Sequence, residues 1–177
     1  ADVEFVAHTS AAFAALKTDR TVVTWGSSKY GGDSLLVSSS LHNISTIYGS
    51  LSAFAAVTGS GGVVAWGKIG YGGDIPSEKV SLLESGVVSI ASTDGAFAAL
   101  KEDGSVVVWG AASRGGDSGN AAPYLTEGVH SVCGNDAAFI TIKTDGSVIG
   151  WGHSVSIPHA GVITQTSELE EVVSLCA

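Results

Sequence analysis

The hydrophobic and polar positions of this chain follow one fifteen-residue pattern that recurs four times without a gap. An apolar segment that contains Phe is followed by a short polar stretch and by a second apolar segment that ends in Trp-Gly. The copies occupy residues 12–26, 53–67, 96–110 and 138–152, and the third reads AFAALKEDGSVVVWG. Two short apolar segments around a polar centre are typical of a β-hairpin, so each copy predicts two antiparallel strands.

The polar stretch predicts a two-residue turn at the centre of each hairpin. The third and fourth copies carry Asp-Gly at 103–104 and 145–146, the strongest short hairpin signal that a sequence offers. The first copy has Arg20 where Gly is expected, and the second has Ser-Gly at 60–61. We therefore expect the first two turns to be slightly strained or to belong to another turn type.

A two-residue turn at 103–104 also sets the register of the two strands. It places Ala98 opposite Trp109 and Phe97 opposite Gly110, so that a small residue faces each large ring. Both faces of the hairpin are then apolar, and such a sheet needs neighbours on both sides. Because the aromatic residues recur in phase, we predict that they are structural core residues rather than ligand platforms. The predicted core rings are Phe13, Trp25, Phe54, Trp66, Phe97, Trp109, Phe139 and Trp151.

A β-branched segment precedes each hairpin and predicts a third strand per repeat. These segments are residues 3–7, 44–48, 87–91 and 129–133. The four Trp are 41, 43 and 42 residues apart, and a fixed period of this length indicates a repeat architecture. The repeats cover approximately residues 1–41, 42–83, 84–126 and 127–170, and residues 171–177 match the opening strand of a fifth period.

The stretch after each Trp-Gly differs between the copies. Three copies carry Gly-Gly-Asp, at 31–33, 72–74 and 115–117. The fourth copy lacks it between residues 153 and 161, as is common in a terminal repeat that caps a stack. A fourth, outer strand or an irregular loop is expected in the segments that follow, which are residues 35–41, 75–83 and 121–125.

Together these patterns predict an all-β, propeller-like array of four repeats of about 42 residues, each a small antiparallel sheet stacked on its neighbours. Two alternatives stay open, a fragment of a larger propeller and an open stack of blades. The segment 171–177 either completes the fourth sheet or belongs to a longer array.

The order Val-Val-Ser-Ile, Ala-Phe-Ala-Ala-Leu-Lys, Asp-Gly-Ser-Val-Val, Trp-Gly and Gly-Gly-Asp resembles the regulator-of-chromosome-condensation repeat, above all its divergent AFAALK-DGSVV-WG-GGDS variety. The resemblance covers nearly the whole chain and implies a β-propeller of four-stranded blades. It also implies nucleotide exchange on a small GTPase as one function. The chain departs from the best-known members because it has four repeats instead of seven, is acidic, and lacks the insertion that some members use for exchange.

The net charge narrows the range of partners. With 17 Asp and Glu against 8 Lys and Arg, the formal charge is −9. Nucleic acids and anionic membrane surfaces require a basic face, so neither is expected as the main partner. No apolar run approaches the ~20 residues of a membrane-spanning helix. The chain has no Met and no signal segment, which we interpret as a processed mature protein or a piece of a longer one. The compartment stays open, and an organelle lumen and the cell exterior are two candidates.

The candidate chemistry is sparse. Asp33, Asp74 and Asp117 lie beside Gly turns and could ligate Ca²⁺, but each stands nearly alone, which favours a structural role in the turn. His153 and His159 lie together in the irregular fourth tail and are candidates for an interaction or a metal contact, although no carboxylate accompanies them. No cofactor and no metal site is predicted.

Cys133 and Cys176 occupy the same position in consecutive repeats. A disulfide between adjacent inner strands is one interpretation, and two buried free thiols in a small apolar slot are the favoured one. Neither has a basic neighbour in sequence that would make it a nucleophile, and the chain contains no Gly-x-Ser-x-Gly elbow and no phosphate-binding loop. We therefore expect no enzyme activity.

The favoured function is a non-enzymatic protein-interaction or scaffold module whose variable loops select an unidentified protein partner. One concrete version is a soluble extrinsic subunit of a larger assembly, such as a membrane or photosynthetic complex. Two alternatives are a module that binds a small molecule, sugar or metal at the propeller channel, and the nucleotide-exchange factor that the resemblance implies.

Overall fold

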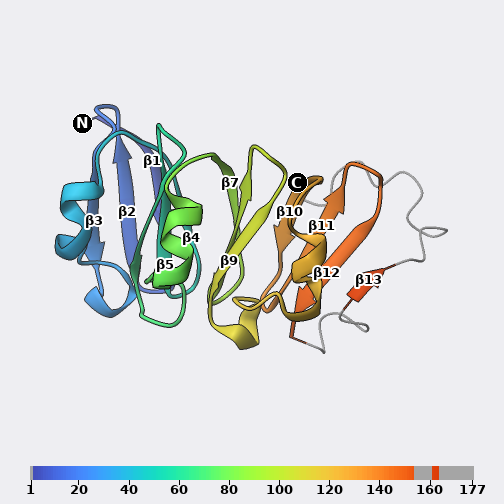
Figure 1. Cartoon of the computed structure of the whole chain (residues 1–177). Helices are drawn as coiled ribbons and strands as arrows, with labels where there is room; N and C mark the ends of the chain where they lie inside the picture. The colour runs from blue at the N-terminus through green and yellow to red at the C-terminus, as the bar shows by residue number, and fades with distance from the viewer. Residues whose placement is uncertain (1, 154–160, 164–177) are drawn as a thin grey trace.

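The computed structural model describes residues 2–153 and 161–163, which form four small antiparallel sheets that follow one another in chain order (Figure 1). The opening strand and the hairpin predicted for each repeat are confirmed, and so is an all-β, propeller-like array of four blades. The strands are β1 (Val3–His8), β2 (Ala12–Lys17) and β3 (Val22–Gly26) in the first sheet, β4 (Ile44–Gly49), β5 (Ala53–Thr58) and β6 (Val63–Gly67) in the second, β7 (Val87–Ser92), β8 (Ala96–Lys101) and β9 (Val106–Gly110) in the third, and β10 (Val129–Gly134), β11 (Ala138–Lys143), β12 (Val148–Gly152) and β13 (Gly161–Ile163) in the fourth.

The tails after Trp-Gly form short helices in the first three repeats rather than a fourth strand. The 3-10 helices are η1 (Ser28–Tyr30), η2 (Leu35–Ser40), η3 (Ser81–Leu83), η4 (Ala112–Arg114) and η5 (Gly119–Tyr124), and the α-helix is α1 (Ser77–Val80). Among the described residues, a fourth strand is present in the last repeat alone, where β13 pairs with β12. Residues 171–177 lie outside the described part of the chain.

The hairpin turns contain three residues rather than the expected two, and this shifts the register by one. In the third repeat the N–H of Gly104 donates to the carbonyl of Lys101 at 2.9 Å, and the N–H of Lys101 donates to the carbonyl of Ser105 at 2.9 Å. Gly104 has a φ of 75°, the left-handed conformation that follows a type I turn in a three-residue hairpin loop. Phe97 therefore pairs with Trp109, and the prediction that a small residue faces each ring is wrong.

The first repeat makes the same turn without Gly. Arg20 has a φ of 65°, and its N–H donates to the carbonyl of Lys17 at 2.9 Å. A residue with a Cβ costs roughly 1–2 kcal/mol in this conformation. The first turn is thus strained, as expected, but its turn type is that of the other three repeats.

The observed register stacks the two rings of each repeat on one face of its sheet. The ring centroids are 5.4, 5.2, 5.3 and 5.3 Å apart in the four repeats. Phe97 and Trp109 lie in one buried cluster with Ala53 and Ala55 of the second sheet. On the opposite face of the third sheet, Ala98 lies in a buried cluster with the rings of the fourth. Each interface therefore pairs a ring face with a small-residue face.

The first sheet is the exception to the predicted ring core. Phe13 and Trp25 are 44% and 45% exposed, whereas the six other rings are buried. The prediction that Phe13 and Trp25 are core residues is wrong. The reason is geometric, because the first sheet lies at one end of the row (Figure 1) and, within the described residues, no other sheet packs on its ring face.

Candidate functional site

The four opening strands end around one open groove, which we call the axial groove. Every repeat contributes the end of its opening strand and the loop that leads into the hairpin. The groove is therefore the place where side chains of all four repeats converge, and it is the candidate binding site. It has a volume of about 670 Å³ and is lined by residues 5–10, 47–51, 92–94 and 134–136.

One side chain in each groove loop stabilises the loop itself by a hydrogen bond to the backbone. Thr9, Ser50, Thr93 and Asn135 each accept, at 2.9–3.0 Å, the backbone N–H of the Ala three residues later. Local bonds of this kind are why Ser, Thr and Asn favour tight connections. In the first and third repeats the Thr hydroxyl also donates to a backbone carbonyl in the tail of its own repeat. These side chains fix the shape of the loops.

The next loop position forms the rim of the groove and differs in every repeat, being Ser10, Leu51, Asp94 and Asp136. Backbone bonds join the rim positions in pairs. The N–H of Ser10 donates to the carbonyl of Leu51 at 3.1 Å, with its hydroxyl at 2.7 Å from the same oxygen, and the N–H of Asp94 donates to the carbonyl of Asp136 at 3.1 Å. The rim is therefore continuous from the first repeat to the second and from the third to the fourth.

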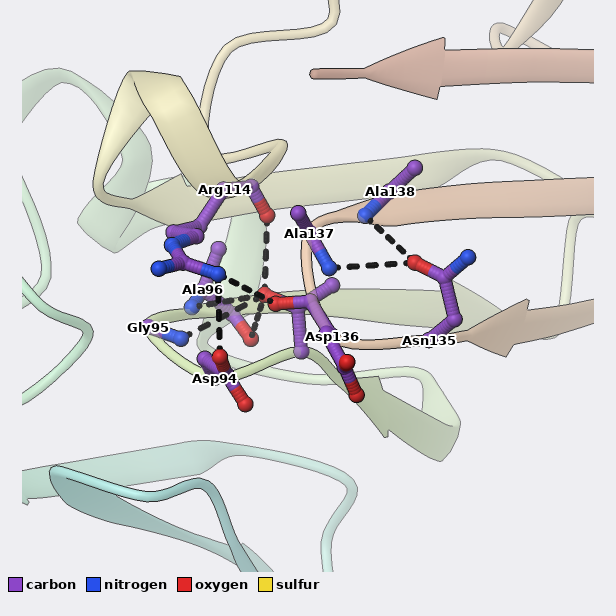
Figure 2. Close-up of polar contacts among 9 residues, drawn as sticks. Asp94, Gly95, Ala96, Arg114, Asn135, Asp136, Ala137 and Ala138 are labelled. Atoms are coloured by element: carbon purple, nitrogen blue, oxygen red, sulfur yellow. Dashed lines mark hydrogen bonds and ion pairs between the residues drawn. The ribbon is translucent and has the colours of Figure 1, made fainter. Parts of the chain in front are cut away.

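Figure 2 shows the rim contact between the third and fourth repeats. Arg114, at the end of η4, donates from Nη1 to Oδ2 of Asp94 at 2.9 Å and to the carbonyl oxygen of Asp136 at 3.2 Å. Asn135 lies beside them and accepts two N–H groups at the start of β11. Among the described residues, the exposed carboxylate of Asp136 has no hydrogen-bond or ion-pair partner. It is available to a ligand.

Glycine allows the opening strands to approach one another at the groove. A Cβ on Gly49 would overlap the carbonyl oxygen of His8, and a Cβ on Gly134 would overlap that of Ser92. The second and third opening strands are joined by the hydroxyl of Ser92, which donates to the carbonyl of Gly49 at 3.0 Å. The strand ends are thus held together by backbone contacts, and the groove is preformed.

The surface of the groove has two chemically different ends. At the first and second repeats, Phe5 and Leu51 are 46% and 50% exposed. At the third and fourth repeats, the charged groups are Asp94, which Arg114 neutralises, and Asp136. The Thr, Ser and Asn side chains of the four loops are engaged with the backbone. Besides His8 and Tyr48, which also line the groove, its chemistry is apolar contact at one end and an acceptor with negative charge at the other.

Of the two sequence-predicted candidates, His153 does not line this groove. His153 is exposed directly after β12, and its N–H donates to the carbonyl of Ala137 at 3.0 Å. His159 lies outside the described residues. Within residues 2–153 and 161–163, no group of three or more His, Cys, Asp and Glu side chains is placed to hold a metal ion.

The repeated tail carboxylates have turn roles. Asp33, Asp74 and Asp117 each accept a backbone N–H of their own tail through Oδ1, at 2.9, 2.6 and 2.9 Å. Cys133 is buried and disulfide-bonded, so the favoured interpretation as a free thiol is wrong for this residue. Cys176 lies outside the described residues.

The hairpin-turn carboxylates are electrostatically distinct, although they lie away from the groove. The side chain of Lys17, followed by Thr21, lowers the pKa of Asp19 to about 2. In the third and fourth repeats, the Ser two residues after the turn Asp lowers the carboxyl pKa by donating from its hydroxyl and its N–H. These groups stabilise turns and offer no pair of carboxylates to a reaction.

Sequence reasoning missed the groove, although a signal for it was present. A hydroxyl or amide residue stands three positions before the first Ala of every hairpin, as Thr9, Ser50, Thr93 and Asn135. A capping residue in phase with the repeat predicts a fixed loop, and the residue after it is then an exposed, variable position. Where the four loops meet depends on the stacking of the sheets, which that signal does not contain.

No family model and no curated protein matches the sequence. Solved structures match the fold. They include yeast RCC1 (Prp20) bound to Kap60, with a TM-score of 0.61 at 16% identity over 85% of this chain and 43% of that chain, and human WBSCR16, with a TM-score of 0.59 at 15% identity over 85% and 47%. Prp20p from Saccharomyces cerevisiae, characterised with its binding properties to Gsp1p and histones, has a TM-score of 0.55 at 18% identity over 85% and 43%.

The chain has an RCC1-type β-propeller fold. The sequence-based resemblance to this repeat is confirmed at the level of the fold. The chain spans less than half the length of each of these RCC1-type proteins. Among the described residues, no helix has the length and apolar character needed to cross a membrane.

Proposed function

We propose that the chain is a non-enzymatic protein-interaction module and that its axial groove binds a polypeptide segment with apolar and basic side chains. The observation that carries the proposal is the division of the groove into an apolar end, at Phe5 and Leu51, and an acidic end, at Asp136. The RCC1-type fold suggests, at a coarse level, protein interaction or an exchange-factor-like function. The groove residues refine this into a preference for one kind of partner.

The contrast between fixed and variable loop positions supports an interaction role. The capping side chains make the same backbone bond in all four repeats. The rim positions directly after them carry a hydroxyl, an isobutyl group and two carboxylates. A rigid framework that presents different exposed side chains at equivalent places is typical of a recognition surface.

The polar groups of the groove favour a polypeptide over a sugar or another small polar ligand. The hydroxyls of Thr9, Ser10 and Thr93 already donate to backbone carbonyls. A small polar ligand that needs these hydroxyls as donors would have to break these bonds, and a buried polar group without a partner costs about 1–3 kcal/mol. An apolar side chain on Leu51 and a cation beside Asp136 require no such exchange. The net charge of −9 also attracts a basic partner over a longer range.

Such a module acts as a scaffold or as an extrinsic subunit of a larger assembly. Yeast RCC1 is bound to Kap60 in one of the similar structures, and Prp20p has binding properties to Gsp1p and histones. These partners belong to those proteins. At 15–18% identity two proteins can share a fold and bind different partners, so we infer the partner from the groove of this chain.

The proposal can be tested with two labelled peptides of equal length, one with alternating Lys and Leu and one with alternating Glu and Leu. Fluorescence anisotropy at about 0.1 M salt is expected to show binding of the Lys-Leu peptide alone. Asp136→Lys should weaken this binding by about tenfold, which corresponds to ~1.4 kcal/mol, because it reverses the charge at the acidic end. Leu51→Asp should weaken it as well, because it removes the apolar contact.

The matched control is Asp33→Lys, which makes the same charge change on an exposed turn outside the groove. It should leave the affinity within about twofold, because charges beyond a Debye length of about 10 Å are screened. Equal binding of both peptides, or an affinity insensitive to Asp136→Lys, would contradict the proposal. The purified chain is also expected not to accelerate nucleotide release from a small GTPase, and acceleration would favour the exchange-factor alternative.

A further inference from the structure

The ring face of the first sheet is an unpartnered copy of a surface that is covered three times elsewhere in the chain. We call it the first-sheet face and define it as Val6, Phe13, Ala15, Val23 and Trp25, which the register places on one side of the sheet. Four of these side chains are 44–52% exposed, and Ala15 is covered by them. An apolar surface of this kind on the end of a stack marks an interaction site.

The equivalent residues of the next three sheets are packed against the preceding sheet. In the second sheet they are Ile47, Phe54, Ala56, Val64 and Trp66, which pack with the small-residue face of the first sheet. The third and fourth sheets repeat the arrangement with the rings of their own hairpins. Apart from His8, which stands where the other opening strands have Gly49, Ser92 and Gly134, the first-sheet face therefore has the side chains of the three internal ring faces.

Each covered ring face also donates an indole hydrogen bond to the preceding repeat, and two of the three add a bond from Lys. The indole N–H donates to the carbonyl of the first Gly of the preceding Gly-Gly-Asp, from Trp66 to Gly31 at 3.0 Å, from Trp109 to Gly72 at 3.1 Å and from Trp151 to Gly115 at 3.0 Å. These three Gly have φ values of 94°, 96° and 88°, and a Cβ on any of them would overlap the next Phe ring. The bond therefore requires Gly in the preceding tail.

In the third and fourth sheets a second polar bond comes from the Lys that ends the second strand, whereas the second sheet has Thr58 at this position. Lys101 donates to the carbonyl of Leu82 at 2.8 Å, and Lys143 donates to that of Tyr124 at 3.0 Å, in both cases in the preceding tail. Lys17, at the same position of the first sheet, instead pairs with its own Asp19 at 2.6 Å. Within the described residues, the indole N–H of Trp25 has no acceptor.

We propose that the first-sheet face docks a further blade of the same repeat type, one that presents an Ala-x-Ala strand and a Gly-Gly-Asp tail. The blade occupies the geometry of the three internal interfaces. The first tail Gly accepts from Trp25, the Ala face covers the rings, and a tail carbonyl accepts from Lys17. This inference is independent of the function proposed for the axial groove.

Features of the chain disfavour a second copy of itself as the occupant. In a head-to-tail pair the fourth repeat would supply the opposing face. It has no Gly-Gly-Asp, and it carries Ile140 where the other repeats have Ala and Ile142 where they have Leu or Val. A symmetric pair would place ring face on ring face, whereas all three internal interfaces place rings on small residues. It would also offer no left-handed Gly carbonyl to Trp25.

The test is the full chain extended by a copy of its own residues 44–86 joined directly before Val3, which keeps the spacing between β4 and β7. The solvent exchange of the Trp25 indole proton is measured by NMR in the extended and the natural chain. We expect exchange to slow by at least tenfold, because the indole gains an acceptor and is covered. The carboxyl pKa of Asp19 should rise from its lowered value, because Lys17 moves to the new tail.

The matched controls are two versions of the extension, one with Gly72→Val and one with Gly70→Val in the added copy. Both Gly have positive φ, but only a Cβ on Gly72 meets a ring of the next sheet, since a Cβ on Gly70 has no atom within 4 Å. The first substitution should restore rapid exchange at Trp25 and the second should not. An extension made from residues 87–128 provides an independent test should the first one fail to fold.

Two results would overturn the proposal. One is a folded extension in which Trp25 still exchanges as fast as in the natural chain. The other is concentration-dependent association of the natural chain in sedimentation equilibrium, with Trp25 protected in the associated form and exposed again in Phe13→Glu, which would make a second copy the occupant.

Discussion

The ring pairs of the first and third sheets have nearly the same stacking geometry, but one pair is exposed and the other is buried. Phe13 and Trp25 stack at 5.4 Å with an interplanar angle of 17°, and Phe97 and Trp109 stack at 5.3 Å with 29°. The first pair is almost half exposed, while the second is fully buried. The stack is therefore a property of the hairpin and its register, whereas the burial is supplied by the preceding repeat.

The Lys residues show the same difference. Lys101 reaches the preceding tail, and Lys17, without a tail to reach, pairs with the Asp19 carboxylate of its own turn. One sequence motif thus adopts two sets of contacts, and the neighbour decides between them. A repeat cannot be assigned a core from its own sequence alone, because half of each core belongs to another repeat.

The largest expected effect is a difference in the free energy of unfolding between the variants of Trp109 and Trp25. Trp109→Ala should lower the free energy of unfolding by ~3–5 kcal/mol, because it removes a fully buried ring and leaves a cavity. Trp25→Ala should cost about 1 kcal/mol or less, since it loses the stacking with Phe13 and little burial. Urea unfolding followed by circular dichroism measures both. Equal losses for the two variants would show that the first-sheet face is covered in solution.

The next effect concerns the Gly that meets the ring. Gly72→Ala should cost ~2–4 kcal/mol, because its Cβ would overlap Phe97 and its φ is 96°. Gly70→Ala is the matched control, since its φ is 73° and its Cβ would be in open space. It should cost only the ~1–2 kcal/mol of the left-handed conformation. Indistinguishable losses would argue against a tight contact between tail and ring.

A smaller effect tests the strained turn of the first repeat. Arg20→Gly should raise the free energy of unfolding by up to ~1 kcal/mol, because Gly adopts a φ of 65° without a Cβ clash. The exposed contact of Arg20 with Glu4, at 3.4 Å, contributes little to oppose this gain. Glu4→Gln serves as the control for that contact in thermal melts. A lower melting temperature for Arg20→Gly would show that the turn is not strained.

The smallest effect concerns the turn carboxylates. The pKa of Asp19 is lowered to about 2, chiefly by the Lys17 side chain. Its contribution to stability is therefore fully present above the ordinary carboxyl pKa and is lost as the pH falls toward about 2. NMR titration of the carboxyl carbon should show Asp19 protonating at lower pH than a free Asp. In Lys17→Gln the midpoint should move upward, and an unchanged midpoint would contradict the assigned cause.

Much of the fold was predictable because its signals are local. Apolar segments around a polar turn place all four hairpins, and the β-branched segments place the opening strands. The register was not predictable from Asp-Gly alone, because the same dipeptide suits a two-residue turn and the end of a three-residue one. The hydrogen bond that closes at Lys101 and Ser105 decides between them, and one residue of difference moves Phe97 from Gly110 to Trp109.

The candidate site was less predictable, because it depends on which repeats meet. The rim pairs of Ser10 with Leu51 and of Asp94 with Asp136 join loops about 42 residues apart in sequence. Arg114 reaches Asp94 from the tail of its own repeat, and this contact depends on where η4 places Arg114 relative to the groove loop. His153 was predicted as an interaction candidate because the fourth tail breaks the repeat pattern. A broken pattern is equally typical of the terminal repeat of a stack, so it does not by itself indicate a binding site.

The bond from each Trp indole to the preceding left-handed Gly gives the array a direction. Every repeat carries a donor facing backward, and the first three repeats carry an acceptor facing forward, so both halves of an interface are encoded within one duplicated unit. A copying event that doubles the unit therefore creates a matched junction at once, without a compensating change elsewhere. Arrays of this kind can lengthen or shorten by whole units during evolution, and the same property makes them suitable for construction to a chosen length.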